Sequence, residues 1–141
     1  MTPNRSDAWL LVAIKGGMGS LDRVLAQADG LNHAIPTQGE WALACDVLGK
    51  LGLIKSSEGC PVVTPQGNSV VEEAIMRAPS SYGAIDLVLA LIQNLPEVGD
   101  PIACPSEDEL AEAYDIYNAR FQKTFQQMKK QEKGKKWPWS R

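Results

Sequence analysis

The segment from Thr37 to Gly67 constrains the fold of this chain more than any other part of its sequence. Thr37 and Glu40 have the spacing of a helix capping box, in which each side chain satisfies an exposed backbone N–H. Apolar residues then recur every three or four positions, which predicts a helix from Thr37 to Leu51. Its predicted core face comprises Trp41, Ala44, Cys45, Leu48 and Leu51, and its outward face comprises Gly39, Ala42, Leu43, Asp46 and Lys50.

A β-hairpin and another helix are predicted directly after this helix. Gly52 ends the helix, and the runs Leu53–Ser56 and Cys60–Val63 have the length of two short strands joined by a tight turn. Thr64 then caps a helix with Pro65 at its first position, where proline costs no hydrogen bond. These signals together predict the order helix, hairpin, helix.

Two further helices precede this segment. The first is predicted from Ser6 to Lys15, with Ser6 or Asp7 as its N-cap, and the glycine cluster at 16–19 ends it. This cluster lacks the spacing and the Lys-Ser/Thr pair of a phosphate-binding loop, so it indicates a turn. Ser20 caps the second helix, whose buried stripe is formed by Leu21, Val24, Leu25 and Ala28.

The region from about residue 5 to 77 resembles the winged helix-turn-helix superfamily, in the style of MarR-like and PadR-like bacterial regulators. The resemblance is carried by Leu48-Gly49-Lys50-Leu51-Gly52-Leu53-Ile54 and, after the hairpin, by Thr64-Pro65-Gln66-Gly67. It implies a mainly α fold with a small β-wing and a three-helix core. The helix from Thr37 to Leu51 would then occupy the DNA-recognition position.

Two more helices are predicted beyond a break at residues 77–81, where a proline and two serines interrupt the pattern. The apolar helix at 85–92 must be covered by the first domain or by a partner chain. The last helix opens at Ser106, where Glu109 completes a second capping box, and runs to about Lys130. The predicted organisation is a winged helix-turn-helix domain at 5–78, two C-terminal helices at 79–130 used for packing or dimerisation, and a basic, tryptophan-containing tail at 131–141.

The last helix carries an apolar stripe with the spacing of a short coiled coil, formed by Leu110, Tyr114, Tyr117, Phe121 and Met128. Two interpretations stay open at this level. The stripe packs on the chain's own core, or it forms an antiparallel or crossed seam between two copies. The resemblance favours the second, because MarR-like and PadR-like proteins dimerise through helices outside the winged domain. The predicted homodimer interface then contains Tyr114, Tyr117 and Phe121.

Composition indicates the class of protein and the compartment in which we expect it. Hydrophobic residues make up 44% and charged residues 22% of its 141 residues, as in ordinary globular proteins, and no apolar run approaches the ~20 residues of a membrane span. The first residues lack the features of a secretory signal, so we expect a cytoplasmic protein. Three cysteines without Cys-x-x-Cys spacing indicate reduced, packed thiols: Cys45, Cys60 and Cys104.

The sequence contains no recognisable catalytic, metal-binding or cofactor-binding motif. His33 is the only histidine, which leaves no histidine-paired nucleophile and no multi-histidine metal site within one chain. The serine pairs at 56–57 and 80–81 lack the Gly-x-Ser-x-Gly context of a hydrolase nucleophile. The acidic residues are expected to be solvated surface charges and helix caps. We therefore expect a protein without enzymatic activity, metal or cofactor.

A DNA interface on the winged domain would use few basic side chains. The net charge of the chain is −3, but residues 116–141 alone carry eight Lys or Arg and one acidic residue. On the winged domain, the candidate contacts to duplex DNA are Thr37, Gln38, Lys50, Lys55 and Arg23. In the tail, the candidate contacts to a polyanion are Lys129, Lys130, Lys133, Lys135 and Lys136, followed by Trp137 and Trp139.

The leading interpretation of the sequence is a dimeric, DNA-binding transcriptional regulator of winged helix type. The alternative is a winged-helix protein-interaction or assembly module without DNA binding. The alternative is favoured by the outward face of the recognition-position helix, where Ala42 and Leu43 would form an apolar contact patch and Asp46 would repel phosphates. A small-molecule sensor would require a cavity beneath Trp9 and Trp41.

Overall fold

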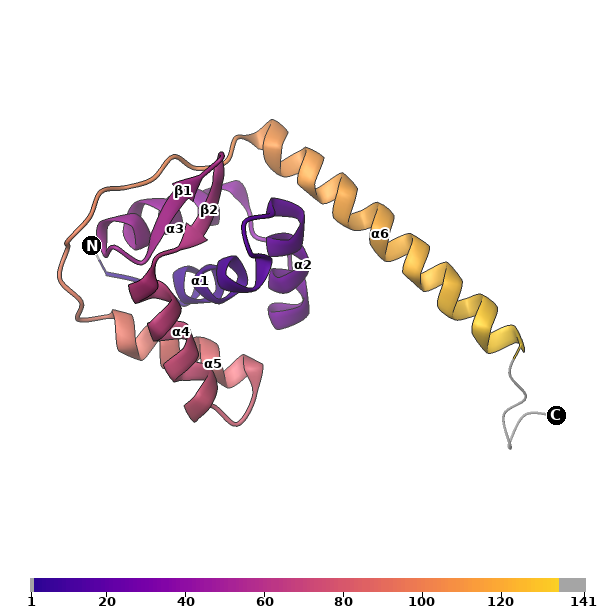
Figure 1. Cartoon of the computed structure of the whole chain (residues 1–141), viewed down its shortest axis with the longest axis horizontal. Helices are drawn as coiled ribbons and strands as arrows, with labels where there is room; N and C mark the ends of the chain where they lie inside the picture. The colour runs from indigo at the N-terminus through magenta and orange to yellow at the C-terminus, as the bar shows by residue number, and fades with distance from the viewer. Residues whose placement is uncertain (1, 135–141) are drawn as a thin grey trace.

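The fold is mainly α-helical with one small antiparallel sheet, as the sequence predicts. The computed structural model describes residues 2–134 of the chain. Figure 1 shows the last helix projecting from a body that the preceding helices and the sheet form. Within residues 2–134 the elements are α1 (Arg5–Gly17), α2 (Leu21–Asn32), α3 (Gln38–Lys50), β1 (Ile54–Ser57), β2 (Cys60–Val63), α4 (Pro65–Arg77), α5 (Ser81–Ile92) and α6 (Glu107–Gly134).

Helix α1 is the centre of the body because it is apolar around its whole circumference. Every residue from Ala8 to Ile14 is buried, and α1 packs against α2, α3, α4, α5 and β2. The indole N–H of Trp9 donates a hydrogen bond to the carbonyl oxygen of Ala28 in α2 at 3.0 Å. The surrounding helices therefore need only one apolar face each to enclose the core.

The beginning of α1 differs from the prediction. Asn4 is the N-cap: its side chain accepts a hydrogen bond from the Asp7 N–H at 3.0 Å, and the Asp7 carboxylate accepts one from the Asn4 N–H at 2.9 Å. The prediction of Ser6 or Asp7 as the N-cap is wrong because the Ser6 hydroxyl instead donates to the Glu40 carboxylate of α3 at 2.8 Å. Asp7 does serve as a capping residue, but it is buried rather than solvated.

The buried Asp7 gives the folded chain a pH dependence that can be measured. Burial raises the pKa of this carboxyl above its ordinary value of 3.8, and the hydrogen bond from Asn4 offsets part of the shift. A raised pKa means that the protonated form favours folding; this contribution is complete below pH 3.8 and is lost as pH rises through the folded-state pKa. The stability of wild type relative to Asp7→Asn should therefore increase as pH falls.

Urea unfolding of both proteins at neutral pH and near the ordinary carboxyl pKa measures this difference. All other carboxylates are common to the two proteins, so their titration cancels in the comparison. A difference that does not change with pH would show that Asp7 titrates alike in the folded and unfolded chain.

The prediction for α3 is confirmed. His33 ends α2 in the left-handed backbone region, with φ of 53°, and a short turn leads to α3. Thr37 and Glu40 form the predicted capping box, with hydrogen bonds of 2.9 and 3.1 Å. The predicted core face is buried, with Trp41 fully enclosed, whereas the outward face is half-buried or exposed, with Leu43 55% exposed.

The hairpin follows α3 through Gly52, whose φ of 72° suits glycine. Strands β1 and β2 pair antiparallel in a register that places Ile54 opposite Val63. The second strand has the predicted bounds, but β1 begins and ends one residue later than predicted. The reason is that the Leu53 N–H still donates to the Leu48 carbonyl oxygen of α3, at 3.0 Å, so Leu53 belongs to the helix exit.

The start of α4 is as predicted, and it ties the helix to the hairpin. Thr64 is the N-cap, and its hydroxyl oxygen accepts a hydrogen bond from the Gly67 N–H at 3.1 Å, with Pro65 at the start of the helix. The same hydroxyl donates to the Gly52 carbonyl oxygen at 2.7 Å. One side chain thus links the exit of α3 to the entry of α4.

Helix α5 is covered by the body itself rather than left for a partner chain. Its residues Ala84, Ile85, Val88 and Ile92 are buried in the same core as α1 and α4, with which it packs. Segment 79–92 therefore shares the core of the preceding helices.

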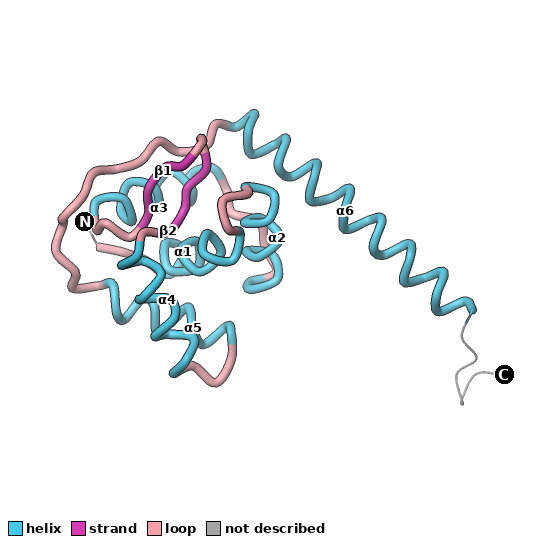
Figure 2. The backbone as a smooth tube through the Cα atoms, in the orientation of Figure 1, coloured by secondary structure: helices cyan, strands magenta, loops and turns pink. Residues whose placement is uncertain are grey.

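Helix α6 is the longest element and leaves the body. The predicted capping box of Ser106 and Glu109 is present, with two hydrogen bonds of 3.1 Å. The helix runs to Gly134, beyond the predicted end near Lys130, because good helix formers continue to Lys133. Figure 2 shows it as one continuous helix that extends away from the other elements.

Candidate interaction surfaces

The predicted DNA contacts lie on three different elements of the body. Thr37 and Gln38 lie at the start of α3, and Lys50 lies at its end, about 20 Å away at a rise of ~1.5 Å per residue. Lys55 is exposed on β1, and Arg23 is exposed on α2. A duplex that touched all of them would have to lie along the full length of α3 and also reach α2.

Two of these side chains are already engaged within the chain. The Thr37 hydroxyl accepts the hydrogen bond that caps α3, and the Lys50 ammonium forms an ion pair with Asp46 at 3.4 Å on the same helix. This pair leaves the outward face of α3 without net positive charge. Because phosphate contacts dominate the affinity of proteins for DNA, the face is poorly suited to a duplex.

The segment between α5 and α6, residues 93–106, crosses the second half of α3; we call it the strap. The Gly99 N–H donates to the Lys50 carbonyl oxygen at 2.9 Å. The strap lies so close to α3 that a Cβ added to Gly49 would lie 2.6 Å from the Asp100 carbonyl oxygen. One flank of α3 is therefore covered by the chain itself.

The cysteines are free thiols with suppressed reactivity. Burial raises the pKa of the Cys45 thiol to about 12, and it also raises the pKa of Cys60 and of Cys104, a residue of the strap that lies beside Cys45. These thiols stay protonated at neutral pH, and the protonated form is a poor nucleophile. They serve as packing groups in this fold.

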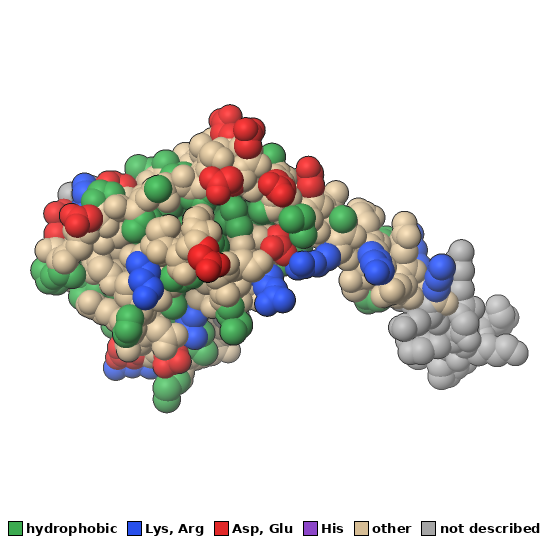
Figure 3. All heavy atoms as spheres, turned by 45° about the horizontal axis from the view of Figure 1, so that its top comes forward, with side chains coloured by type: hydrophobic (Ala, Val, Ile, Leu, Met, Phe, Trp, Pro, Cys, Tyr) green, Lys and Arg blue, Asp and Glu red, His purple; other side chains and the backbone are tan. Residues whose placement is uncertain are grey.

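Charge is segregated between the body and the far end of the chain. Residues 1–115 contain six Lys or Arg and 16 Asp or Glu. In Figure 3 the acidic side chains lie mainly over the body and the start of α6, and the basic ones gather along the projecting part of α6. The body should therefore repel polyanions and attract basic partners. The described basic residues of α6 are Arg120, which lies where the helix meets α2, and Lys123, Lys129 and Lys130 beyond it.

The first half of α6 is held against α2. The Tyr117 hydroxyl donates to the Asp29 carboxylate at 2.5 Å, and the Arg120 guanidinium pairs with Asp22 at 2.5 Å. The hydrogen bond to Asp29 raises the pKa of Tyr117 to about 12, so the phenol stays a donor at neutral pH. Tyr117, predicted as a dimer contact, thus has a role within its own chain.

Beyond Arg120 the apolar residues of α6 are exposed. Phe121, Phe125 and Met128 are 53%, 45% and 56% exposed, and their spacing of four and three residues places them on one helix face. The two rings stack with centroids 6.3 Å apart, and the Lys129 ammonium lies 4.7 Å from the Phe125 centroid. We call these three apolar residues the α6 stripe. Figure 1 shows that this part of α6 stands clear of the body.

The remaining predicted contacts divide between the end of α6 and the tail. Tyr114 is 43% exposed near the point where α6 meets α2, and Lys129 and Lys130 are exposed near the end of the helix. The side chains of the other tail residues lie outside the described residues: Lys133, Lys135, Lys136, Trp137 and Trp139.

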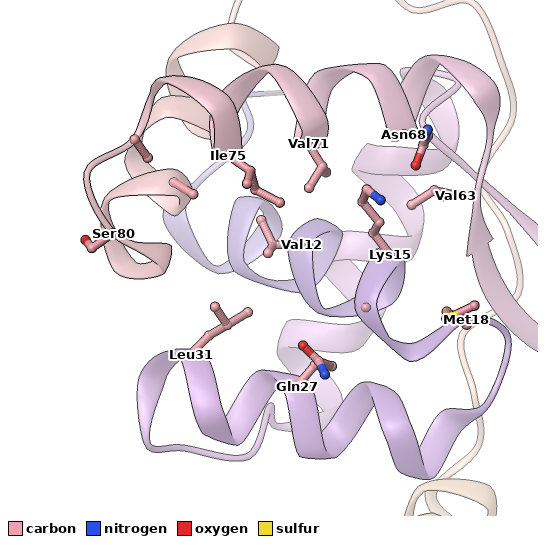
Figure 4. A pocket seen from close by; sticks show the side chains of 13 residues that line it. Val12, Lys15, Met18, Gln27, Leu31, Val63, Asn68, Val71, Ile75 and Ser80 are labelled. Carbon is pink, nitrogen blue, oxygen red and sulfur yellow. The ribbon is translucent and has the colours of Figure 1, made fainter.

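A groove of about 790 Å³ lies among α1, α2, α4 and the first residues of α5; we call it the α1–α4 groove. In Figure 4 Val71 and Ile75 extend into it from α4, Leu31 lies on the opposite side on α2, and Val12 of α1 lies between them. Lys15 lies toward one end, and it pairs loosely with an acidic residue of α4 at 3.9 Å. Most of the walls are apolar, which suits the docking of hydrophobic side chains.

Comparisons with known proteins assign the chain to no family. No protein-family model, curated protein or solved structure matches the chain. Among the helices of residues 2–134, none is both long enough and apolar enough to cross a membrane. The same part of the chain holds no group of three His, Cys, Asp or Glu side chains placed to bind a metal.

The sequence identified part of the α6 stripe but not the α1–α4 groove. Phe121 was predicted as an interface residue, and Phe125 and Met128 extend the same face. The sequence gives no local sign of the groove, because its lining residues come from separate helices; one of them, Ile75 of α4, is 52% exposed. The cavity also lies away from Trp9 and Trp41, beneath which the sequence would place a sensor cavity.

Proposed function

We propose that this chain is a non-enzymatic winged-helix protein-interaction module, in which the body is the scaffold and α6 is the docking element. The observation that carries the proposal is the α6 stripe. Three large apolar side chains about half exposed on one face of a projecting helix form a surface that water solvates poorly. Contiguous exposed apolar surfaces of this kind mark sites of protein interaction.

The order of elements supports the winged-helix part of the proposal. Three helices, a hairpin and a fourth helix follow one another as the resemblance implies, with α3 in the recognition position. The surroundings of α3 argue against DNA as its ligand, because Lys50 is paired with Asp46, the strap covers one flank and the body is acidic. We therefore assign the interaction to α6 rather than to α3.

The cytoplasm is the compartment that fits this module. All three cysteines are free thiols, the state that a reducing compartment maintains.

A DNA-binding transcriptional regulator is the second candidate function. It is favoured by Lys55, which is exposed on the hairpin where a wing would touch the DNA backbone, and by the basic second half of α6. In this candidate, Gln38 at the start of α3 would contact a base edge or a phosphate.

Fluorescence anisotropy with a labelled mixed-sequence duplex separates the two candidates. The samples are the intact chain, a chain ending at Gln131, and the Lys55→Ala variant of the shorter chain, each titrated with salt. The interaction module predicts no binding by the chain ending at Gln131 at moderate salt. Salt-sensitive binding by that chain, weakened in Lys55→Ala, would instead establish the DNA-binding regulator. Binding by the intact chain alone would assign DNA contact to residues 132–141.

A further inference from the structure

We infer that the partner of the α6 stripe is a second copy of this chain, whose α1–α4 groove receives the stripe. The inference rests on the proposed function and names the partner for the same surface. Each copy carries both the projecting stripe and the receiving groove, so two copies can exchange helices reciprocally. Exchange of this kind closes the assembly as a dimer.

The two surfaces match in chemistry and shape. An amphipathic helix that enters a groove presents anchors at positions such as i, i+4 and i+7, which is the spacing of Phe121, Phe125 and Met128. The groove offers apolar walls from α1, α2 and α4, and its volume of about 790 Å³ is within the range of sites that enclose bulky apolar groups. Ile75 is half-exposed on its wall and would be covered by the incoming helix.

A chain cannot place the stripe in its own groove. Helix α6 contains neither glycine nor proline between Glu107 and Lys133, so it has no hinge at which to turn back. Its first half is fixed to α2 by the Tyr117 and Arg120 contacts. The stripe therefore points away from the body, and a groove that receives it belongs to another molecule (Figure 1).

Charge favours this contact over a seam between two α6 helices. From residue 116 to residue 130, α6 carries four basic residues and no acidic one, so two such segments side by side would repel each other. The body of a second copy is acidic overall, and α4, which forms one wall of the groove, carries Glu72 and Glu73 in ion pairs with Lys15 and Arg77 at 3.9 and 3.4 Å. The basic residues that flank the stripe would therefore approach a body of net negative charge rather than a second basic helix.

The area of contact explains why the exchange should be reciprocal. Three half-exposed side chains of this size bury roughly 300 Å² on entering the groove, or roughly 600 Å² when both partners are counted. Stable complexes bury about 1,200–2,000 Å², which one such contact does not provide. Two contacts in a reciprocal dimer provide about twice the area and reach the lower end of that range.

Sedimentation equilibrium of the full chain, over a range of protein concentrations, tests the inference. Phe125→Glu alters the stripe and Ile75→Glu alters the groove; both residues are about half exposed, so the body should still fold, which circular dichroism verifies. Gln122→Glu on α6 and Met76→Glu on α4 are the matched controls, because they add the same charge at exposed positions outside the stripe and the groove. The inference predicts a wild-type dimer whose dissociation constant rises about tenfold or more in the first pair and stays nearly unchanged in the controls.

A mixture of Phe125→Glu and Ile75→Glu gives the most specific readout. The Ile75→Glu chain retains an intact stripe and the Phe125→Glu chain retains an intact groove, so a mixed pair keeps one complete contact and should associate more weakly than wild type. This mixed association should be stronger than that of either variant alone. A direct seam between α6 helices would not show it, because Ile75→Glu would then dimerise like wild type.

Several outcomes overturn the inference. A dimer that survives Ile75→Glu but not Phe125→Glu would place the contact between α6 helices. A dimer unaffected by either substitution would place it elsewhere. A monomeric wild type would exclude self-association, and if it bound decanoate and lost that binding in Ile75→Glu, the groove would be a site for small apolar acids. The proposed function fails separately, in the anisotropy assay, if the chain ending at Gln131 binds duplex DNA.

Discussion

Trp41→Ala is expected to lower the free energy of unfolding by about 3–5 kcal/mol, the usual cost of truncating a large aromatic residue in a packed core. Trp41 is fully buried on α3, where it fills the space between that helix and the core around α1. Removal of the indole leaves a cavity that the surrounding helices can close only in part. Since small domains are stable by about 5–15 kcal/mol, this variant should lose much of its stability.

Urea unfolding followed by circular dichroism measures this loss, and Leu43→Ala is the matched control. Leu43 lies on the same helix but is 55% exposed, so its truncation should change the free energy of unfolding far less. A loss below about 1 kcal/mol for Trp41→Ala would mean that the buried face of α3 is wrongly assigned.

The fold could be predicted from the sequence wherever a local signal and the apolar pattern agree. The capping box of Thr37 and Glu40 and the buried face of α3 are examples, and Thr64 before Pro65 marked α4 equally well. The signal failed at Asn4, because a serine and an aspartate next to the true cap looked equally suitable. The reciprocal hydrogen bonds of Asn4 and Asp7 identify the cap, and the contact of Ser6 with Glu40, distant in sequence, occupies the competing Ser6 hydroxyl.

The candidate surfaces were less predictable because they depend on how elements are placed in space. The spacing of the α6 stripe is visible in the sequence, but its exposure depends on where α6 leaves α2, which Tyr117 and Asp29 determine. The strap over α3 has no periodic pattern, so its position against Gly49 could not be foreseen. The groove is formed by apolar residues of four helices. Because each helix contributes only a few of them, no single segment of the sequence predicts the groove.

Gly67→Ala is expected to destabilise the chain by about 2–3 kcal/mol, although alanine is normally the better helix residue. A Cβ at Gly67 would come closer to the Leu53 carbonyl oxygen than real Cβ atoms ever approach a neighbour. That oxygen belongs to the backbone and accepts the Thr64 N–H at 3.0 Å, so it cannot move without weakening the junction between hairpin and helix. Either α4 or the hairpin must shift, and the Thr64 cap is strained in both cases.

Gly30→Ala is the same substitution at another helix position, but there it is expected to stabilise the chain. Gly30 lies in α2, and a Cβ there would meet nothing within 4 Å, so alanine should raise the free energy of unfolding by about 0.5–1 kcal/mol. Urea unfolding of the two variants beside wild type should therefore give shifts of opposite sign. Equal stabilisation by both would show that α4 does not touch Leu53. In that case the close packing of the hairpin against α4, which brings Val63 to the same groove as Val71, would have to be abandoned.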